Sequence, residues 1–427
     1  MRRIWNILTF LIMIMCLISC DFKKKGDSTN SQTDMTAKNI LGNPDFLAIS
    51  YGGYRMNTRD IQPTLPQLKE DLLILHAMGV RILRTYNVQL PHASNVLKSI
   101  RELKQENPQF EMYVMLGAWI DCKNAWTGLP VDHNVESEQN AGEIARAVAL
   151  ANEYQDIVKV IAVGNEAMVK WAESYYVQPS VILKWVNHLQ DLKNKDKLSK
   201  ELWITSSDDF SSWGGGDRLY HVEDLKKLYK AVDYVSMHTY PMHNSHYNPF
   251  FWGVTEKEQE LTKEEQINLA MNRALTFATD QYDSVKSYMN SIGIDKPIHI
   301  GETGWASFDN HLYGKGGSNA TDELKEGLYY KSIRGWSNKN NVSCFYFEAF
   351  DEPWKDAQNA KGSENHFGLF KLDGSAKYAV WDAVDQNLFE GLTRSGKPIE
   401  KSYNGNFEEL LKDALLPNLN PKMELVN

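Results

Sequence analysis

The stretch Lys296-Pro-Ile-His-Ile-Gly-Glu-Thr-Gly-Trp305 decides the interpretation of the whole chain. Residues 297–300 have the composition of a short strand, with glycine on either side. Glu302 follows where this strand ends, and Trp305 lies just beyond it. A carboxylate beside an aromatic side chain at a strand end suits a site that holds the face of a sugar and performs charge chemistry next to it. Taken alone, the pattern also fits a glutamate that simply faces solvent.

A second segment has the same construction. Val160-Ile-Ala-Val-Gly-Asn-Glu166 is another β-rich run that ends in a glutamate, and here Asn165 precedes the acid. Two strand-terminal glutamates are a more specific signal than one, because paired carboxylates can divide acid, base and nucleophile roles between them.

The body of the chain alternates short β-rich runs with helical patterns, which predicts parallel strands joined by crossover helices. The predicted strands are residues 46–54, 80–86, 110–119, 157–166, 202–208, 232–240, 297–302 and 342–350. The first predicted helix starts at Thr64, a capping residue before Pro66, and the later ones cover residues 94–105, 141–154, 179–192, 222–229, 263–290 and 322–336.

Eight such strand–helix units predict an α/β protein with a (β/α)₈ TIM barrel. A doubly wound open sheet is the alternative. That fold usually carries a glycine-rich phosphate turn after its first strand, and Tyr51-Gly-Gly-Tyr54 lacks the required spacing.

Polar side chains gather at the carboxyl ends of the predicted strands, which is where a barrel of this kind places its active site. They are Arg84, Tyr86, Trp119, Asp121, Asn165, Glu166, Asp208, Asp209, His238, Tyr240, Glu302, Glu348 and Asp351. Solvated loop charges would not fall so consistently on strand ends. The predicted barrel and the predicted site therefore agree with each other.

The two glutamates fit glycoside cleavage with retention of configuration. That reaction needs two carboxyl groups about 5–5.5 Å apart, one protonated and one ionised. Strands four and seven face each other across a barrel, so Glu166 and Glu302 can flank a bound sugar. Asn165 can donate to a sugar 2-hydroxyl, and Arg84 and Tyr240 can hold one carboxylate ionised.

Three ordered motifs resemble those of glycoside hydrolase family 17. They are Val163-Gly-Asn-Glu166, Gly301-Glu-Thr-Gly-Trp-Ala-Ser307 and Phe347-Glu-Ala-Phe-Asp-Glu-Pro-Trp-Lys355. The resemblance covers residues 46 to about 384. It implies a β-1,3-glucan-active enzyme of a retaining clan, with Glu166 as acid/base and Glu302 as nucleophile. Ala306 replaces a usual proline, and His238 is a less usual residue whose role is open.

Further residues are candidates for contact with a glucan. The predicted substrate-binding set is Arg84, Tyr86, Trp119, Asn165, His238, Tyr240, Trp305, Glu348, Trp354 and Lys355. Trp126, Trp171 and Trp213 also follow strand ends and are possible sugar platforms. Glu348 and Lys355 equally fit a structural ion pair. The aromatic segment within residues 242–263 fits either a subsite or a lid.

Other functions stay open at this stage. His238, His243 and His246 can be combined into a metal site, but no flanking carboxylate pattern supports one, and we expect no metal or other cofactor. A transglycosylase would use the same two glutamates and pass the glycosyl group to another glucan. A glucan-binding lipoprotein without chemistry is a third class, and the presence of both glutamates argues against it.

Charge and composition limit the partners. The net charge is −9 at pH 7, and no basic block occurs in the body of the chain. Nucleic acids and anionic polysaccharides need clustered Lys or Arg, so a neutral polymer is the easier substrate. We expect a monomer.

The first residues have the pattern of a targeting segment. Arg2-Arg3 precedes an apolar run over residues 4–18, and Leu17-Ile-Ser-Cys20 resembles the lipobox of bacterial lipoproteins. An ordinary cleaved signal is the alternative. The resemblance implies acylation of Cys20 and a lipid anchor in the bacterial cell envelope, on the periplasmic or surface face of the outer membrane.

The predicted domains are a signal peptide at 1–19, a flexible tether at 20–43, the catalytic barrel at 44–390 and a C-terminal extension at 391–427 that either packs on the barrel or is loose. Two cysteines remain in the body, Cys122 and Cys344. They are too isolated for a disulfide framework or a metal motif, and we expect buried thiols.

Overall fold

The computed structural model describes residues 35–420. Cys20, the predicted signal peptide and most of the predicted tether lie outside the described residues. Among the helices that the structure describes, none has the length and apolar run needed to cross a membrane.

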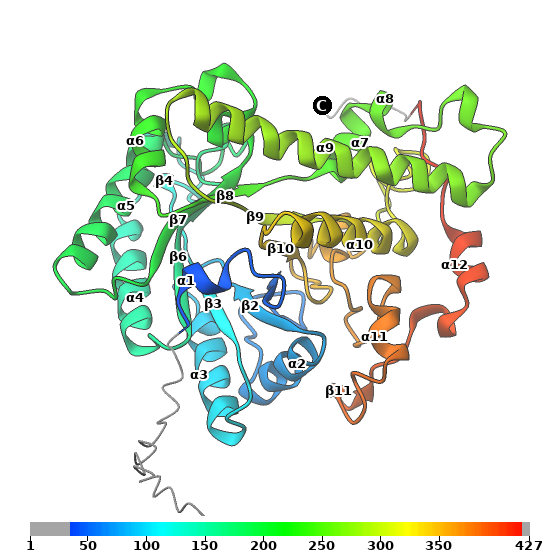
Figure 1. The fold of residues 1–427 in the computed structure, drawn as a ribbon, viewed down its shortest axis with the longest axis horizontal. Helices are drawn as coiled ribbons and strands as arrows, with labels where there is room; N and C mark the ends of the chain where they lie inside the picture. The colour runs from blue at the N-terminus through cyan, green and yellow to red at the C-terminus, as the bar shows by residue number, and fades with distance from the viewer. Residues whose placement is uncertain (1–34, 421–427) are drawn as a thin grey trace, which may run out of the picture. The chain divides into compact units, whose positions relative to one another are not determined.

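Eight parallel strands close into a barrel in the order β1-β10-β9-β8-β7-β6-β3-β2 (Figure 1). Their bounds are β1 Leu47–Ser50, β2 Val80–Arg84, β3 Tyr113–Ala118, β6 Val158–Asn165, β7 Trp203–Asp209, β8 Val235–His238, β9 Ile298–Gly304 and β10 Cys344–Phe347. The predicted (β/α)₈ barrel is therefore confirmed. Several strands end earlier than predicted, because the residues after them leave the ladder to form the loops at the barrel mouth.

The crossover helices surround the barrel at the predicted places. They are α2 Leu65–Ala77, α3 Pro91–Glu106, α4 Gln139–Glu153, α5 Pro179–Asn194, α6 Glu223–Ala231, α9 Lys263–Ser291 and α10 Glu323–Lys339. Thr64 caps α2, since its side chain accepts from the backbone N–H of Gln67. The Gln67 side-chain oxygen in turn accepts from the backbone N–H of Thr64. Thr262 and Glu265 form the same capping box at α9.

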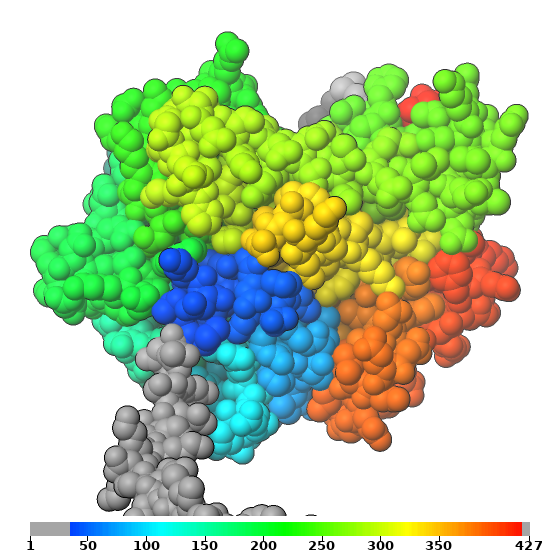
Figure 2. All heavy atoms as spheres, viewed as in Figure 1, coloured from blue at the N-terminus to red at the C-terminus, as the bar shows by residue number. Residues whose placement is uncertain are grey.

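The two ends of the barrel sequence meet where β1 pairs with β10. Gly42 N–H donates to Ser343 Oγ at 2.8 Å, and Arg334 of α10 donates to the Ala48 carbonyl. The blue and gold atoms that adjoin in Figure 2 belong to these parts of the chain. The short helix α1, Ala37–Ile40, buries Ala37 and Ile40 against side chains of the barrel interior. The predicted tether therefore extends too far, because it included these core residues.

Several short elements were not predicted. β4 Cys122–Lys123 pairs with β5 Asp132–Glu136 in a hairpin after β3, and β11 Thr393–Arg394 pairs with β12 Lys397–Pro398. α7 Pro241–Tyr247 and α8 Pro249–Trp252 follow β8, and α11 Trp381–Asp385 and α12 Phe407–Asp413 follow β10. Elements of two to seven residues are too short to show a hydrophobic period.

Residues 391–420 lie against the barrel helices. Arg394 makes an ion pair with Asp71 of α2 at 2.9 Å, and both side chains are buried. Ser402 donates to Glu323 of α10 at 2.5 Å, and Asn418 N–H donates to the Ser318 carbonyl at 3.0 Å. Cys122 and Cys344 are free and buried, as predicted.

Candidate active site

Glu302 lies near the end of β9, and both of its carboxylate oxygens are held. Arg84 Nη1 and the Tyr86 hydroxyl donate to Oε2 at 2.7 and 2.8 Å, and the Tyr240 hydroxyl donates to Oε1 at 2.6 Å. Burial alone would raise the pKa of Glu302, but the Arg84 charge and the two tyrosine hydrogen bonds bring it below its ordinary value. This carboxylate is therefore kept ionised.

Glu166 follows the last residue of β6 and has a left-handed backbone, with φ of 46°. This conformation is uncommon for a residue other than glycine and is often found at functional sites. It is fixed here by a hydrogen bond from the Glu166 N–H to the Ser207 carbonyl at 3.0 Å. Burial, followed by the nearby charges of Glu302 and Asp209, raises the pKa of Glu166 well above its usual range. This carboxyl group is therefore kept protonated.

The two carboxyl groups are close to each other. One oxygen of Glu166, one oxygen of Glu302 and a ring nitrogen of His238 all lie within 4.8 Å of one another. This is near the separation of about 5–5.5 Å that a retaining pair requires, and well below the roughly 6.5–9.5 Å of an inverting pair. Asn165 accepts from Arg84 through its Oδ1, so its amide N–H groups are the part that can serve a sugar hydroxyl.

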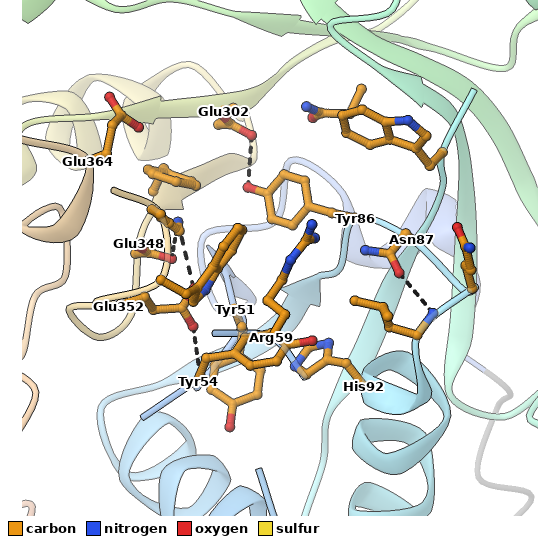
Figure 3. Close-up of a pocket in the computed structure, with 18 of the residues that line it drawn as sticks. Tyr51, Tyr54, Arg59, Tyr86, Asn87, His92, Glu302, Glu348, Glu352 and Glu364 are labelled. Atoms are coloured by element: carbon orange, nitrogen blue, oxygen red, sulfur yellow. Dashed lines mark hydrogen bonds and ion pairs between the residues drawn. The ribbon is translucent and has the colours of Figure 1, made fainter. Parts of the chain in front are cut away.

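A cavity of about 620 Å³ opens beside Glu302. Figure 3 shows Glu302 and the Tyr86 hydroxyl meeting on one side, with Glu348, Glu352 and Tyr54 gathered on another. The lining residues come from the segments that follow β1, β2, β3 and β10, including His92 of α3 and Phe347 at the end of β10, together with Asn165 and Glu302. They are Tyr51, Gly52, Tyr54, Arg59, Tyr86, Asn87, Gln89, Leu90, His92, Trp119, Asp121, Trp126, Asn165, Glu302, Phe347, Glu348, Glu352, Trp354, Lys355 and Glu364.

The motif after β10 forms one wall of this cavity. Lys355 Nζ lies 2.7 Å from Glu348 Oε2 and 3.7 Å from the Phe347 ring centroid. The Trp354 indole donates to Glu352 at 2.9 Å. Within the described chain, Oε1 of Glu348 is a buried oxygen that has no hydrogen-bond partner. Glu348 and Lys355 are thus both an ion pair and part of the cavity.

Aromatic side chains form another part of the cavity wall. Trp126, on the loop between β4 and β5, stacks on Tyr175 with ring centroids 5.2 Å apart, and Trp119 lies 5.3 Å from the same tyrosine. Trp126 is 63% exposed and lines the cavity. Trp171 is similarly exposed, at 64%, but is not among the lining residues.

Two other predicted tryptophans are buried away from the cavity. Trp305 is fully buried, donates to the Ala320 carbonyl at 2.9 Å and packs against Trp252 and Tyr329. Trp213 is also fully buried and donates to the Ser236 carbonyl at 3.0 Å. The prediction of a sugar contact by Trp305 is wrong, because the chain turns the indole inward, into the hydrophobic core.

Several lining residues were missed from sequence. Glu352 stands inside the motif that ends at Lys355, and this position was a usable signal. Arg59 and Glu364 come from loops, and His92 lies in the first turn of α3; none of them belongs to a motif that would single it out. Their role depends on how the barrel brings distant loops together.

The histidines do not form the cluster that was considered as a metal site. Among residues 35–420, the metal-type side chains that come together are Glu166, His238 and Glu302, without His243 and His246. The Arg84 guanidinium at 2.7 Å from Glu302 disfavours a second cation there. The absence of a metal requirement stays a prediction, which activity after exhaustive chelation will test.

The BtgE/BtgC glycoside hydrolase domain model matches residues 48–368, which contain all eight strands except the first residue of β1. The chain belongs to the BtgE/BtgC glycoside hydrolase family. Both glutamates and the whole cavity lie inside the matched residues.

Relatives of this BtgE/BtgC domain include a probable glucan endo-1,3-beta-glucosidase of Aspergillus terreus, 23% identical over 82% of this chain. The chain spans about half the length of that curated relative, 48% of it. An endo-laminarinase structure from Formosa Hel1_33_131 matches with 67% identity and a TM-score of 0.90, over 92% of this chain and 100% of the other.

A family 17 β-1,3-glucanosyltransferase structure from Rhizomucor miehei matches at 19% identity with a TM-score of 0.54. It covers 78% of this chain and 96% of the other. This likeness shows the fold alone.

Proposed function

We propose that the chain is a retaining glycoside hydrolase of the family 17 type that cleaves β-1,3-glucan of the laminarin kind at internal bonds. The observation that carries this proposal is the pair of carboxyl groups within 4.8 Å whose pKa values are displaced in opposite directions. Two carboxyl groups with different protonation states are what retaining cleavage needs.

In the first step, ionised Glu302 attacks the anomeric carbon and forms a glycosyl ester. Glu166 gives its proton to the leaving glycosidic oxygen as the old bond breaks. In the second step, Glu166, now ionised, takes a proton from water, and the water oxygen attacks the anomeric carbon. The bond to Glu302 breaks and the product keeps its β configuration. Asn165 holds the 2-hydroxyl of the sugar that is transferred.

The cavity is proposed to hold the glycone side of the substrate. It contains Glu302 and Asn165, which serve the transferred sugar, while Glu166 is not among its lining residues. Tyr86 and Trp119 line the cavity and offer aromatic faces to pyranose rings. The substrate is neutral β-1,3-glucan, in agreement with the acidic net charge and with the endo-laminarinase at 67% identity.

Cleavage of laminari-oligosaccharides labelled at the reducing end tests this proposal. Early release of internal products, with the new reducing end first in the β form by NMR, supports endo cleavage with retention. Products longer than the substrate would instead identify a transglycosylase. Binding without turnover would identify a glucan-binding protein, and activity on β-1,4-glucan with none on laminarin would overturn the substrate assignment.

We also propose that Cys20 is acylated and anchors the enzyme, as a monomer, in the bacterial cell envelope. The support is the lipobox-like Leu17-Ile-Ser-Cys20 sequence alone. Labelling with a fatty-acid analogue should mark the wild-type chain and not the Cys20→Ser variant. An unlabelled wild-type chain that is released into the medium would overturn this assignment.

A further inference from the structure

A buried histidine links Glu166 to two serines inside the barrel. His238, the last residue of β8, is fully buried, and its Nδ1 lies 3.0 Å from Glu166 Oε1. Its Nε2 lies 2.8 Å from Ser207 Oγ, which in turn lies 2.8 Å from Ser236 Oγ. Both ring nitrogens are therefore engaged, and one of them contacts the proposed acid/base.

The serine pair is built into neighbouring strands. Ser207 of β7 and Ser236 of β8 are register partners, and both are fully buried. Gly301 of β9 makes room for them, since a Cβ at that position would lie 2.0 Å from Ser236 Oγ and 2.5 Å from Ser207 Oγ. Any residue larger than glycine at position 301 would disturb this chain of hydroxyl groups.

His238 is neutral at ordinary pH, because burial lowers its pKa to about 3 even though Glu302 and Asp209 act in the opposite direction. A neutral imidazole carries one N–H, so its tautomer decides whether the nitrogen that faces Glu166 is a hydrogen-bond donor or an acceptor. With the proton on Nδ1, the ring donates to Glu166. With the proton on Nε2, the ring would accept from Glu166 and would compete for the proton that the leaving group needs.

We propose that His238 is a positioning residue that holds the Nδ1–H tautomer and donates to Oε1 of Glu166, while the Ser207 hydroxyl donates to Nε2. Oε2 of Glu166 then carries the proton that passes to the leaving oxygen, and it later takes the proton from water. His238 neither gains nor loses a proton in either step. The proposal rests on the acid/base role proposed above for Glu166.

The surroundings of Glu166 contain several other charges that also act on its proton. They are Arg84 from β2, Asp208 and Asp209 from β7, Glu302 from β9, Glu364 from the loop after β10, and the hydroxyl groups of Tyr175 and Tyr240. The histidine adds a donor to the ionised form. Loss of the histidine therefore raises the pKa of Glu166. It also destabilises the ionised Glu166 that the first step produces.

Two substitutions of His238 test the roles of its two ring nitrogens one at a time. His238→Asn places an amide N–H near the position of Nδ1, whereas His238→Gln places it near Nε2. We expect His238→Asn to keep kcat on laminari-oligosaccharides within about threefold of wild type, and His238→Gln to lose about tenfold or more, since a hydrogen bond to a charged group is worth about 1.5–3 kcal/mol. The basic limb of the kcat/KM profile should move to higher pH in His238→Gln only. Equal losses in both variants with an unmoved basic limb would overturn the proposal.

The wild-type enzyme supplies a measurement that needs no variant. The ¹⁵N shifts of His238, assigned by the peak that disappears in His238→Asn, should report a neutral ring with its proton on Nδ1. A proton on Nε2, or a charged ring at pH 7, would overturn the proposal. Glu166→Ala distinguishes a failure of the acid/base assignment from a failure of the positioning role of His238. If that variant cleaves laminarin normally, the acid/base assignment fails; if it is inactive while His238 carries Nε2–H, the positioning role alone fails.

Discussion

At the scale of single residues, the two glutamates differ because of what surrounds them. Glu302 faces Arg84 and two tyrosine hydroxyls, all of which favour its ionised form. Glu166 faces the negative charges of Glu302 and Asp209 in a buried setting, which favours its protonated form. The bell-shaped activity profile that follows has an acidic limb set by Glu302 and a basic limb set by Glu166.

Arg84→Met should move the acidic limb. Glu302 must be ionised to attack, so activity falls as the pH drops through its pKa. Removing the Arg84 charge raises that pKa, and the limb should shift to higher pH by about one to three units, with a large loss of kcat at neutral pH. Arg84→Lys keeps the charge and should shift the limb less. An unmoved acidic limb in Arg84→Met would show that Arg84 does not set the ionisation of Glu302.

At the scale of elements, the hairpin β4–β5 presents Trp126 to the cavity. Burial of roughly 60 Å² of indole under a sugar ring, at about 25 cal/mol per Å², gives about 1.5 kcal/mol. Trp126→Ala should therefore raise KM for laminari-oligosaccharides by about tenfold with a small effect on kcat. Trp171→Ala is a matched control, because Trp171 is equally exposed but does not line the cavity. Equal effects of the two variants would remove Trp126 from the substrate site.

Some of these elements were predicted from the sequence and others were not. The eight strands and Thr64 at the start of α2 follow from composition, period and capping chemistry, and the structure has all of them, although several strands end earlier than predicted. The glutamate pair was predicted because both residues end a strand. The hairpin that carries Trp126 is too short for a period, and the inward turn of Trp305 is decided by tertiary packing against Trp252 and Tyr329. Local sequence contains neither fact.

At the scale of the whole molecule, the C-terminal residues are joined to the start of the barrel. Arg394 on β11 lies 2.9 Å from Asp71 of α2, and the guanidinium is 4.0 Å from the Phe350 ring centroid just after β10. Arg55 also reaches Asp71, at 2.9 Å. This buried cluster connects the first crossover helix with the chain that follows the last strand.

Arg394→Ala should destabilise the fold by about 3–5 kcal/mol, since it removes one main partner of a buried carboxylate. Urea unfolding followed by tryptophan fluorescence measures this loss. Lys397 on the same hairpin makes an exposed ion pair with Asp373, at 3.5 Å, and Lys397→Ala should cost about 0–1 kcal/mol. A loss for Arg394→Ala as small as that for Lys397→Ala would show that the C-terminal segment does not stabilise the barrel.

Azide rescue of the two glutamate variants tests the division of roles most directly. With an aryl β-laminaribioside that has a good leaving group, Glu302→Ala should be inactive alone and should yield the α-glycosyl azide when azide enters the vacated space. Glu166→Ala should form the glycosyl-enzyme, release it slowly and yield the β-glycosyl azide. The anomeric proton of each product reports the configuration by NMR. A β-azide from Glu302→Ala together with an α-azide from Glu166→Ala would contradict the assignment of nucleophile and acid/base.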